Sequence, residues 1–405
     1  MDFYRKVACL YLAKYWVLCY VIDSGNKPRY FARLEPLVCE LAMHKRALVH
    51  HIFVFLQLFS GCVKMSLYSL YPGLIRPLVF SMDPENAHSL TISTGRFLSK
   101  QPLLKLFSQN VALKPVEVMG LKFDNPVGLA AGMDKNGDAI DYFGALGFGY
   151  LELGTVTPKP QDGNPRPRMF RVKEARGLIN GMGFNNKGVD YLVNNLLNRH
   201  YKGIVGVSIG KNETTPIENA ASDYIICMQK VYNCCDYIAV NVSCPNTPAL
   251  TALQEAEPLI RLLTALKEEQ SRLQKQYNRY VPLVVKVAPD LTDEQLMAVC
   301  DACVDLKIDG MTCTNTTTSR SEIHGMSHAS EWGGLSGEPI QFKSTETLKK
   351  AAARLNGRIP LIGVGGINGI IAARDKMCAG ASLIQLYSSL IYQGPIVVKE
   401  IVDNL

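Results

Sequence analysis

Short polar motifs recur along residues 131–388, and each directly follows an apolar segment. They contain asparagine, threonine, glycine and lysine, as in Asn241-Val-Ser-Cys-Pro-Asn246-Thr247 and Thr314-Asn315-Thr316. An asparagine amide offers both a donor and an acceptor, which suits a ring edge with alternating N–H and C=O groups. Glycine loops expose backbone N–H groups to an anion, and lysine adds charge. No Ser-His-Asp set or metal-ligating cluster accompanies these motifs, so we expect an organic ligand with an anionic group and no metal.

The elements that position these motifs repeat as a short apolar strand, a polar loop and a helix. Eight strands are predicted, at residues 127–131, 150–153, 203–207, 237–242, 283–287, 310–313, 361–364 and 383–386. This alternation predicts an α/β fold of the parallel (α/β)8 TIM-barrel type, in which the loops after the strands build the active site. A doubly wound open sheet would need a phosphate fingerprint after its first strand, and Gly128-Leu-Ala-Ala-Gly-Met133 is not one.

Flavins and pyrimidines both have the ring edges that these motifs suit. Glycines after the last two strands would leave backbone N–H groups for a phosphate, which is where such barrels commonly bind one. Lys286 would then lie under a flavin ring and stabilise negative charge on it. A buried structural lysine is the alternative interpretation.

The twelve cysteines are predicted to be buried thiols in a reducing compartment. Cys300 and Cys303 form a C-x-x-C, but they fall in a helix that a capping box from Thr292 to Gln295 opens. No second pair stands at zinc-ribbon spacing. Thr215, followed by a proline, is predicted to cap another helix.

The 405 residues are enough for one barrel, residues 101–405, with N-terminal additions. The net charge of +7 is mild, and no run of five Lys or Arg predicts nucleic-acid binding. Residues 65–100 are predicted to form two amphipathic helices, 67–80 and 84–98. These helices either cap the barrel or lie in a membrane surface.

Residues 1–64 differ in composition and contain two apolar stretches, 7–22 and 47–63. Lys14 interrupts the first and His50 the second, so neither has the roughly 20 apolar residues of a spanning helix. The segment is an anchor, a leader, or the product of a start assigned upstream of Met65. We expect it to be dispensable, and a variant beginning at Met65 should keep activity and membrane association. Loss of membrane binding would instead identify an anchor.

Several motifs resemble the class 2, quinone-linked dihydroorotate dehydrogenases over nearly all of residues 66–405, and the bacterial branch most. They are Met82-Asp-Pro-Glu-Asn-Ala-His88, Gly128-Leu-Ala-Ala-Gly-Met-Asp-Lys135, Leu153-Gly-Thr-Val-Thr-Pro158, Gly183-Phe-Asn-Asn186, Gly334-Leu-Ser-Gly337 and Gly363-Val-Gly-Gly366. The resemblance implies oxidation of (S)-dihydroorotate to orotate in pyrimidine synthesis, with FMN as cofactor and a membrane quinone as acceptor. It also implies peripheral attachment to the cytoplasmic side of the cell inner membrane, or alternatively to the mitochondrial inner membrane.

The resemblance also implies roles for individual residues. FMN would be held by Ala131, Gly132, Lys135, Thr155, Ser208, Asn241, Lys286, Thr314, Gly337, Gly366, Tyr387 and Ser388. Dihydroorotate would be held by Lys135, Asn180, Gly181, Met182, Gly183, Phe184, Asn241, Asn246, Asn315 and Thr316. Cys244 would remove a proton from C5, with Lys135, Thr247 and Phe184 in the catalytic set. His88 and Arg171 would lie near the inner end of a quinone tunnel.

Four positions depart from the class 2 pattern. Cys244 replaces the serine base and is typical of the soluble class 1 enzymes, Ser208 replaces an asparagine, and Gly181 replaces an arginine. The family's Gly-Leu-Arg is Ala249-Leu250-Thr251. Two alternatives therefore stay open: a soluble class 1 type that uses fumarate or NAD, and a catalytically impaired FMN-binding protein of the membrane surface.

Overall fold

A closed barrel of eight parallel strands forms the centre of the protein. The computed structural model describes residues 67–100, 103–246 and 250–405, so the segment 1–64, its two apolar stretches and Thr247 lie outside the described residues. In the order in which neighbours pair around the barrel, the strands are β10 (Gly310–Cys313), β12 (Leu361–Val364), β13 (Ala381–Leu386), β3 (Val127–Leu129), β4 (Tyr150–Val156), β7 (Ile204–Ile209), β8 (Tyr237–Asn241) and β9 (Leu283–Val287). The predicted (α/β)8 barrel is confirmed, and strand ends differ from the prediction by at most three residues.

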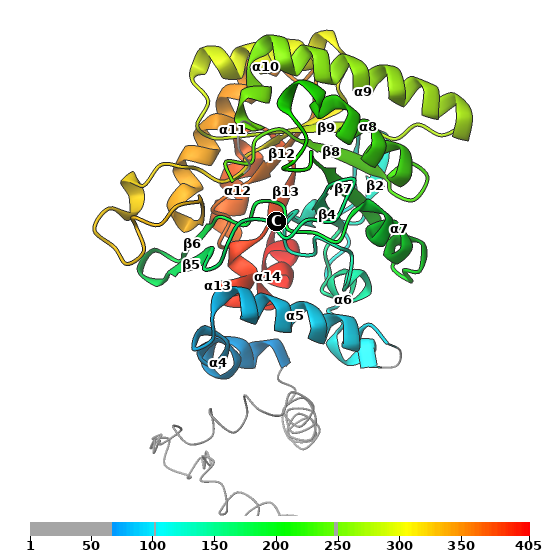
Figure 1. Cartoon of the computed structure of the whole chain (residues 1–405). Helices are drawn as coiled ribbons and strands as arrows, with labels where there is room; N and C mark the ends of the chain where they lie inside the picture. The colour runs from blue at the N-terminus through cyan, green and yellow to red at the C-terminus, as the bar shows by residue number, and fades with distance from the viewer. Residues whose placement is uncertain (1–66, 101–102, 247–249) are drawn as a thin grey trace, which may run out of the picture. The chain divides into compact units, whose positions relative to one another are not determined.

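Helices surround this barrel, as Figure 1 shows. They are α6 (Ile140–Ala145), α7 (Val189–Leu197), α8 (Ala220–Val231), α9 (Ala256–Tyr277), α10 (Asp293–Asp305), α11 (Gln341–Leu355), α12 (Ile370–Cys378), α13 (Ser388–Gln393) and α14 (Ile396–Asn404). The capping box of Thr292 and Gln295 opens α10 as predicted. The predicted cap at Thr215 is wrong, because α8 begins only at Ala220, after the short turn Ile217–Asn219. The backbone carbonyl of Thr215 instead accepts a hydrogen bond from Lys211 Nζ.

Large side chains fill the barrel interior because glycines on neighbouring strands make room for them. A Cβ at Gly128 would lie 2.3 Å from the ring of Tyr150, and one at Gly206 would lie 2.1 Å from the ring of Tyr237. A hairpin of β1 (Val116–Val118) and β2 (Leu121–Phe123) adds Phe123, whose ring packs edge-on against Tyr150 at 5.1 Å. The interior is therefore a packed core, and ligands are confined to one end of the barrel.

A second sheet comes from loops that follow two of the barrel strands. Its strands are β5 (Met169–Val172), β6 (Gly177–Asn180) and β11 (Gly334–Gly337), which pair antiparallel in the order β11-β6-β5. Short helical turns η4 (Lys173–Ala175), η7 (Ser321–Ile323) and η8 (Glu338–Ile340) flank these strands. The sheet brings the loop after β4 next to the loop after β10, although about 150 residues of sequence, from Asn180 to Gly334, separate the paired strands.

The helical segment before the barrel departs in part from its prediction. The helix predicted at residues 67–80 has those bounds, but its type changes along the segment, from a 3-10 turn (η1, Leu67–Leu70) through a π turn (η2, Tyr71–Ile75) to α4 (Arg76–Phe80). Pro72 and Pro77 lack the backbone N–H that a continuous α-helix requires, which explains the change. The second helix is α5 (Pro84–Leu98), as expected. Within the described parts of the chain, no helix is long and apolar enough to span a membrane.

A buried ion pair attaches α5 to the loop before β5. Glu85 is 5% exposed and accepts hydrogen bonds from Arg168 Nε (3.1 Å) and Nη2 (2.7 Å), and from Arg166 Nη2 (2.8 Å). Burial alone would raise the pKa of Glu85, but the hydrogen bond and charge of Arg168 lower it below its ordinary value. The carboxylate is therefore ionised at neutral pH and neutralises a buried guanidinium.

Replacing Glu85 by alanine should lower the free energy of unfolding by about 3 kcal/mol, because Arg168 would stay buried without its carboxylate. Chemical denaturation followed by circular dichroism measures this loss. Because folding lowers the pKa of Glu85, the stabilisation by its carboxylate is complete at pH values above the ordinary carboxyl pKa. This stabilisation disappears as pH falls through the lowered pKa of the folded protein. The difference in the free energy of unfolding between Glu85→Ala and the parent should therefore become smaller at acidic pH. Glu257→Ala, which breaks an exposed pair with Arg261, is the control and should cost under about 0.5 kcal/mol. Equal costs for both variants would contradict the analysis.

Candidate active site

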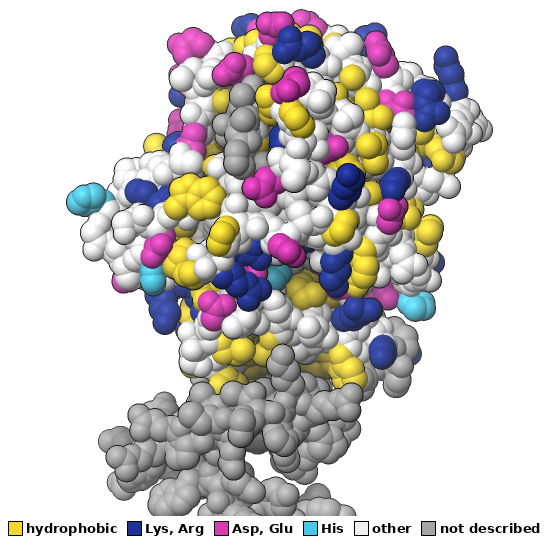
Figure 2. Space-filling model, in the orientation of Figure 1, with side chains coloured by type: hydrophobic (Ala, Val, Ile, Leu, Met, Phe, Trp, Pro, Cys, Tyr) yellow, Lys and Arg dark blue, Asp and Glu magenta, His cyan; other side chains and the backbone are white. Residues whose placement is uncertain are grey.

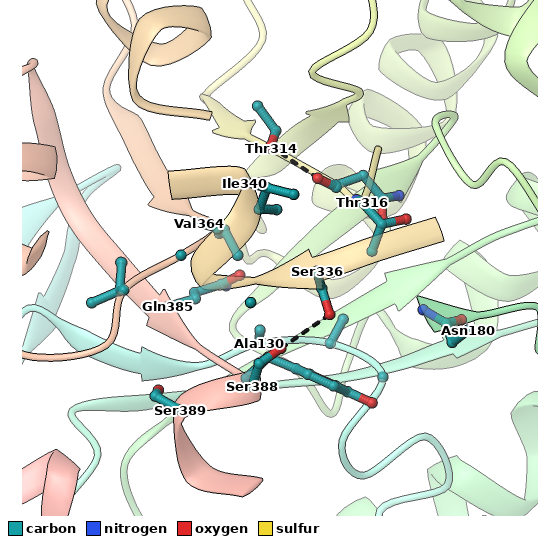
Figure 3. A pocket seen from close by; sticks show the side chains of 18 of the residues that line it. Ala130, Asn180, Thr314, Thr316, Ser336, Ile340, Val364, Gln385, Ser388 and Ser389 are labelled. Carbon is teal, nitrogen blue, oxygen red and sulfur yellow. Dashed lines mark hydrogen bonds between the residues drawn. The ribbon is translucent and has the colours of Figure 1, made fainter. Parts of the chain in front are cut away.

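A large cavity lies where the barrel strands end, beside the sheet of β5, β6 and β11. It contains about 1160 Å³ of empty space, a value that includes the open solvent at its mouth. Most of the residues predicted to bind ligands line it: Ala131, Gly132, Lys135, Thr155, Asn180, Met182, Gly183, Phe184, Asn241, Cys244, Asn246, Lys286, Thr314, Asn315, Thr316, Gly337, Gly366, Tyr387 and Ser388. In Figure 3, side chains from several of these segments surround one space.

Two predicted residues stand behind the cavity wall. Ser208 is fully buried, and its hydroxyl lies 2.8 Å from the hydroxyl of Thr155, which does line the cavity. Gly181 packs beneath Trp332, and a Cβ at Gly181 would lie 2.6 Å from that ring. Trp332 therefore occupies the space that the arginine of the family pattern would need.

The two predicted quinone residues, His88 of α5 and Arg171 of β5, do not line the cavity. Arg171 donates to the carbonyl of Met82 at 2.8 Å, and its guanidinium lies 4.6 Å from the ring centre of Phe80. It thereby fixes the turn between α4 and α5. Burial, with a smaller effect from the charge of Lys135, lowers the pKa of His88 to about 4, so its imidazole is neutral at physiological pH.

One wall of the cavity presents connected asparagine amides. Asn315 Nδ2 donates to Asn241 Oδ1 at 3.2 Å, and Asn246 Nδ2 donates to Asn180 Oδ1 at 3.1 Å. The side-chain oxygen of Asn246 is buried and accepts no hydrogen bond from the described residues. An unused buried acceptor is costly, and a ligand N–H would satisfy it.

Lys135 supplies a cation beside these amides. Its Nζ donates to Asn185 Oδ1 at 2.6 Å. Burial, followed by the charge of Arg168, lowers the pKa of Lys135 to about 8, although Glu85 and Cys244 oppose this. The amine is thus mostly protonated at neutral pH and suits a carboxylate ligand.

A second cation, Lys286, lies against a carboxylate at the floor of the cavity. Glu152 is fully buried, with its Oε1 3.6 Å from Lys286 Nζ, and it accepts from Tyr237 (2.9 Å) and Gln385 (2.8 Å). The side-chain oxygen of Gln385 has no partner among the described residues and lines the cavity. Our sequence analysis missed Glu152 and Gln385. Their signal was a polar residue inside each of two otherwise apolar strands.

The loop after β12 provides an anion site built from backbone. Gly365 and Gly366 have φ angles of 111° and 75°, and a Cβ at Gly366 would lie 2.3 Å from Gln341 Cα. From the end of the neighbouring strand β13, the Ser388 hydroxyl lies 3.0 Å from that of Ser336, a hydrogen bond drawn in Figure 3. Free backbone N–H groups beside hydroxyls suit a phosphate.

Among the cysteines that the structure describes, Cys244 is the one that lines the cavity. It lies in the loop after β8, between the ligand-facing Asn241 and Asn246, and is 8% exposed. Burial raises the pKa of Cys300 to about 11 and that of Cys303 further, as expected of structural thiols. Within the described residues no group of His, Cys, Asp or Glu gathers as a metal site.

Comparisons with known proteins agree on one family. The sequence model described as dihydroorotate dehydrogenase matches residues 113–405. Proteins named dihydroorotate dehydrogenase (quinone) from Baumannia cicadellinicola and Enterobacter sp. are each 54% identical over 336 residues, covering 83% of this chain and 100% of theirs. The crystal structure of the Eimeria tenella enzyme in complex with ferulenol matches with a TM-score of 0.73 and 34% identity, covering 81% of this chain and 93% of the other.

Proposed function

Because the chain belongs to the dihydroorotate dehydrogenase family, we propose that FMN is its flavin and that the cavity residues described above carry out its reaction. The protein is a flavoprotein oxidoreductase that oxidises dihydroorotate to orotate in pyrimidine synthesis, with a quinone as its electron acceptor. The observation that supports the finer assignment is that a glycine loop, two lysines and the asparagine amides converge on this one cavity.

FMN fits the half of the cavity that holds the glycine loop. Gly366, Tyr387 and Ser388 would hold its phosphate, and Thr155, Asn241, Lys286 and Thr314 would hold its ring, with the unused oxygen of Gln385 as an acceptor for a ring N–H. Ser208 acts on this site through Thr155. When bound, the flavin supplies the acceptor for the hydride that leaves C6 of dihydroorotate.

Dihydroorotate fits the half that holds Lys135 and the asparagines. Lys135 would bind its carboxylate, and Asn180, Asn246 and Asn315 would pair with the N–H and C=O groups of its ring. Met182, Gly183 and Phe184 would cover the ring from the loop after β6. These contacts leave C5 facing Cys244, which would remove the C5 proton as general base. Thr247 and Phe184 would border the path by which that proton leaves.

The acceptor side of the reaction concerns α4 and α5. Leu74, Ile75 and Leu78 of η2 and α4 are 55%, 38% and 40% exposed, and Figure 2 shows hydrophobic side chains at this end of the described surface. A quinone would enter between these helices toward Arg171 and the neutral His88. The same apolar surface would attach the protein peripherally to the cytoplasmic side of the inner membrane.

The purified protein should carry FMN, and dihydroorotate should bleach its visible spectrum in the absence of oxygen. A quinone should then restore the colour faster than fumarate or NAD does. Absorbance spectra in a stopped-flow instrument measure both half-reactions. A protein that stays colourless and inactive with added FMN would contradict the assignment, whereas preference for fumarate or NAD would favour the class 1 interpretation that Cys244 suggests.

Exchanging Leu74 and Leu78 together for glutamine should weaken binding to anionic lipid vesicles and slow quinone reduction, because it removes apolar area from the membrane-facing surface. Bleaching by dihydroorotate should continue at the parental rate. Vesicle sedimentation and quinone turnover measure the two effects. The matched control exchanges Leu197 and Ile371, which are 70% and 76% exposed on α7 and α12. If control and test variants behave alike, the surface has no such role.

Cys244→Ala should retain its flavin and bind orotate, yet bleach slower by a factor on the order of 10² to 10⁴, the usual contribution of a positioned base. Cys244→Ser should keep much of the rate with its pH profile moved upward, since a cysteine ordinarily ionises near pH 8.5 and a serine hydroxyl far higher. Rapid-reaction bleaching across pH measures both. A Cys244→Ala variant that bleaches at nearly the parental rate would place the base elsewhere.

A further inference from the structure

A fully buried lysine lies behind the anion loop, outside the cavity itself. Lys376 of α12 has no exposed surface, and its Nζ donates to the hydroxyl of Ser344 on α11 at 2.5 Å. No acidic side chain in the described part of the chain forms an ion pair with it. A buried cation without an anion is costly, so its place calls for a compensating charge.

The hydrogen bonds that start at Lys376 run toward the cavity. Ser344 accepts from Lys376, and its single hydroxyl hydrogen can then go to the carbonyl of Gly365 at 3.0 Å or to that of Gln341 in its own helix at 3.1 Å. The peptide between Gly365 and Gly366 is trans, so its N–H points opposite to its C=O. That N–H belongs to Gly366, which lines the cavity, and no hydrogen bond among the described residues uses it.

Linked hydrogen bonds polarise one another in a low-dielectric interior. A charge on Lys376 therefore strengthens the Gly366 N–H as a donor, through Ser344 and the Gly365 carbonyl. The proposed function gives this N–H an anionic partner, the phosphate of FMN. Resting on that function, we propose that Lys376 is a positioning residue for the flavin phosphate, acting through Ser344 without touching the phosphate.

The proposal implies that FMN binding depends on pH. Burial lowers the pKa of Lys376 to about 7, and the charge of Asp375 on α12 opposes this, while the Cys313 thiol of β10 also lies near the amine. Burial in turn raises the pKa of Cys313 far above its ordinary value, so that thiol stays neutral. A bound phosphate dianion favours the protonated amine and raises its pKa. The part of the FMN affinity that protonated Lys376 contributes is thus complete below about pH 7 and is lost as pH rises above that value.

The test compares FMN with riboflavin, which lacks the phosphate. The full-length protein is purified with its flavin or exchanged into riboflavin and is then diluted, and the fluorescence of the released flavin gives the Kd of each flavin. The Kd is measured between about pH 6.5 and 8.5, because the phosphate, whose second pKa is near 6, is mostly a dianion over this range. Lys376→Met should weaken FMN by roughly tenfold to a hundredfold at the lower pH, as loss of a charged hydrogen-bond donor does. Riboflavin affinity should stay near the parental value, and the pH dependence of FMN binding should disappear.

Ser344→Ala provides a second variant, and it should weaken FMN in the same direction without affecting riboflavin. Lys211→Met is the control, since Lys211 is also buried (3% exposed) but bonds only to the carbonyls of Asn212 and Thr215. If Lys376→Met does not fold, the flavin affinities of Ser344→Ala and the pH dependence of FMN binding by the parent protein test the proposal. Equal weakening of both flavins, or parental FMN binding that is independent of pH, would overturn the proposal. A parent that binds riboflavin and not FMN would instead contradict FMN as the cofactor.

Discussion

One fully buried carboxylate shows how closely the site depends on closure of the barrel. Glu152 belongs to β4, and the groups that neutralise or bond it come from three other strands: Tyr237 from β8, Lys286 from β9 and Gln385 from β13. Only a closed barrel brings these four strands around one point. A lone charge there would be severely destabilising, so the cluster both requires closure and sets a lysine and an amide at the floor of the cavity.

Features that depend on local sequence pattern could be predicted, and they include the eight strands and the helix opened by Thr292. The polar residues after each strand also predicted much of the cavity wall, because the carboxyl ends of parallel strands all lie at the same end of the barrel. Features that depend on distant partners could not be predicted. Trp332 over Gly181, Thr155 in front of Ser208, and the pairing of β6 with β11 each join segments far apart in the sequence. The change of helix type at residues 67–75 follows from Pro72 and Pro77, to which our prediction gave less weight than to the helical spacing of the apolar residues.

Hydrogen bonds link helix α5 to the wall of the cavity. Glu85 of α5 binds Arg168, whose carbonyl accepts from the backbone N–H of Gly181 at 2.7 Å. Arg168 also donates to the carbonyl of Asn164, and the Asn164 amide donates to the carbonyls of Gly181 and Asn246. A displacement of α5 would therefore reach Asn246 in the cavity wall through four residues in contact, which are Glu85, Arg168, Asn164 and Asn246 itself.

The pairing that closes the barrel joins β3 to β13, with Val127 opposite Ile384. During synthesis the first barrel strand leaves the ribosome long before its last neighbour has been made, so that edge of the sheet has to wait unpaired. Gly366, Tyr387 and Ser388 follow the two strands made last, so they complete the cavity wall only when this final pairing occurs. An unpaired sheet edge is prone to aggregation, so the nascent barrel carries that hazard until β13 has been made and has paired with β3.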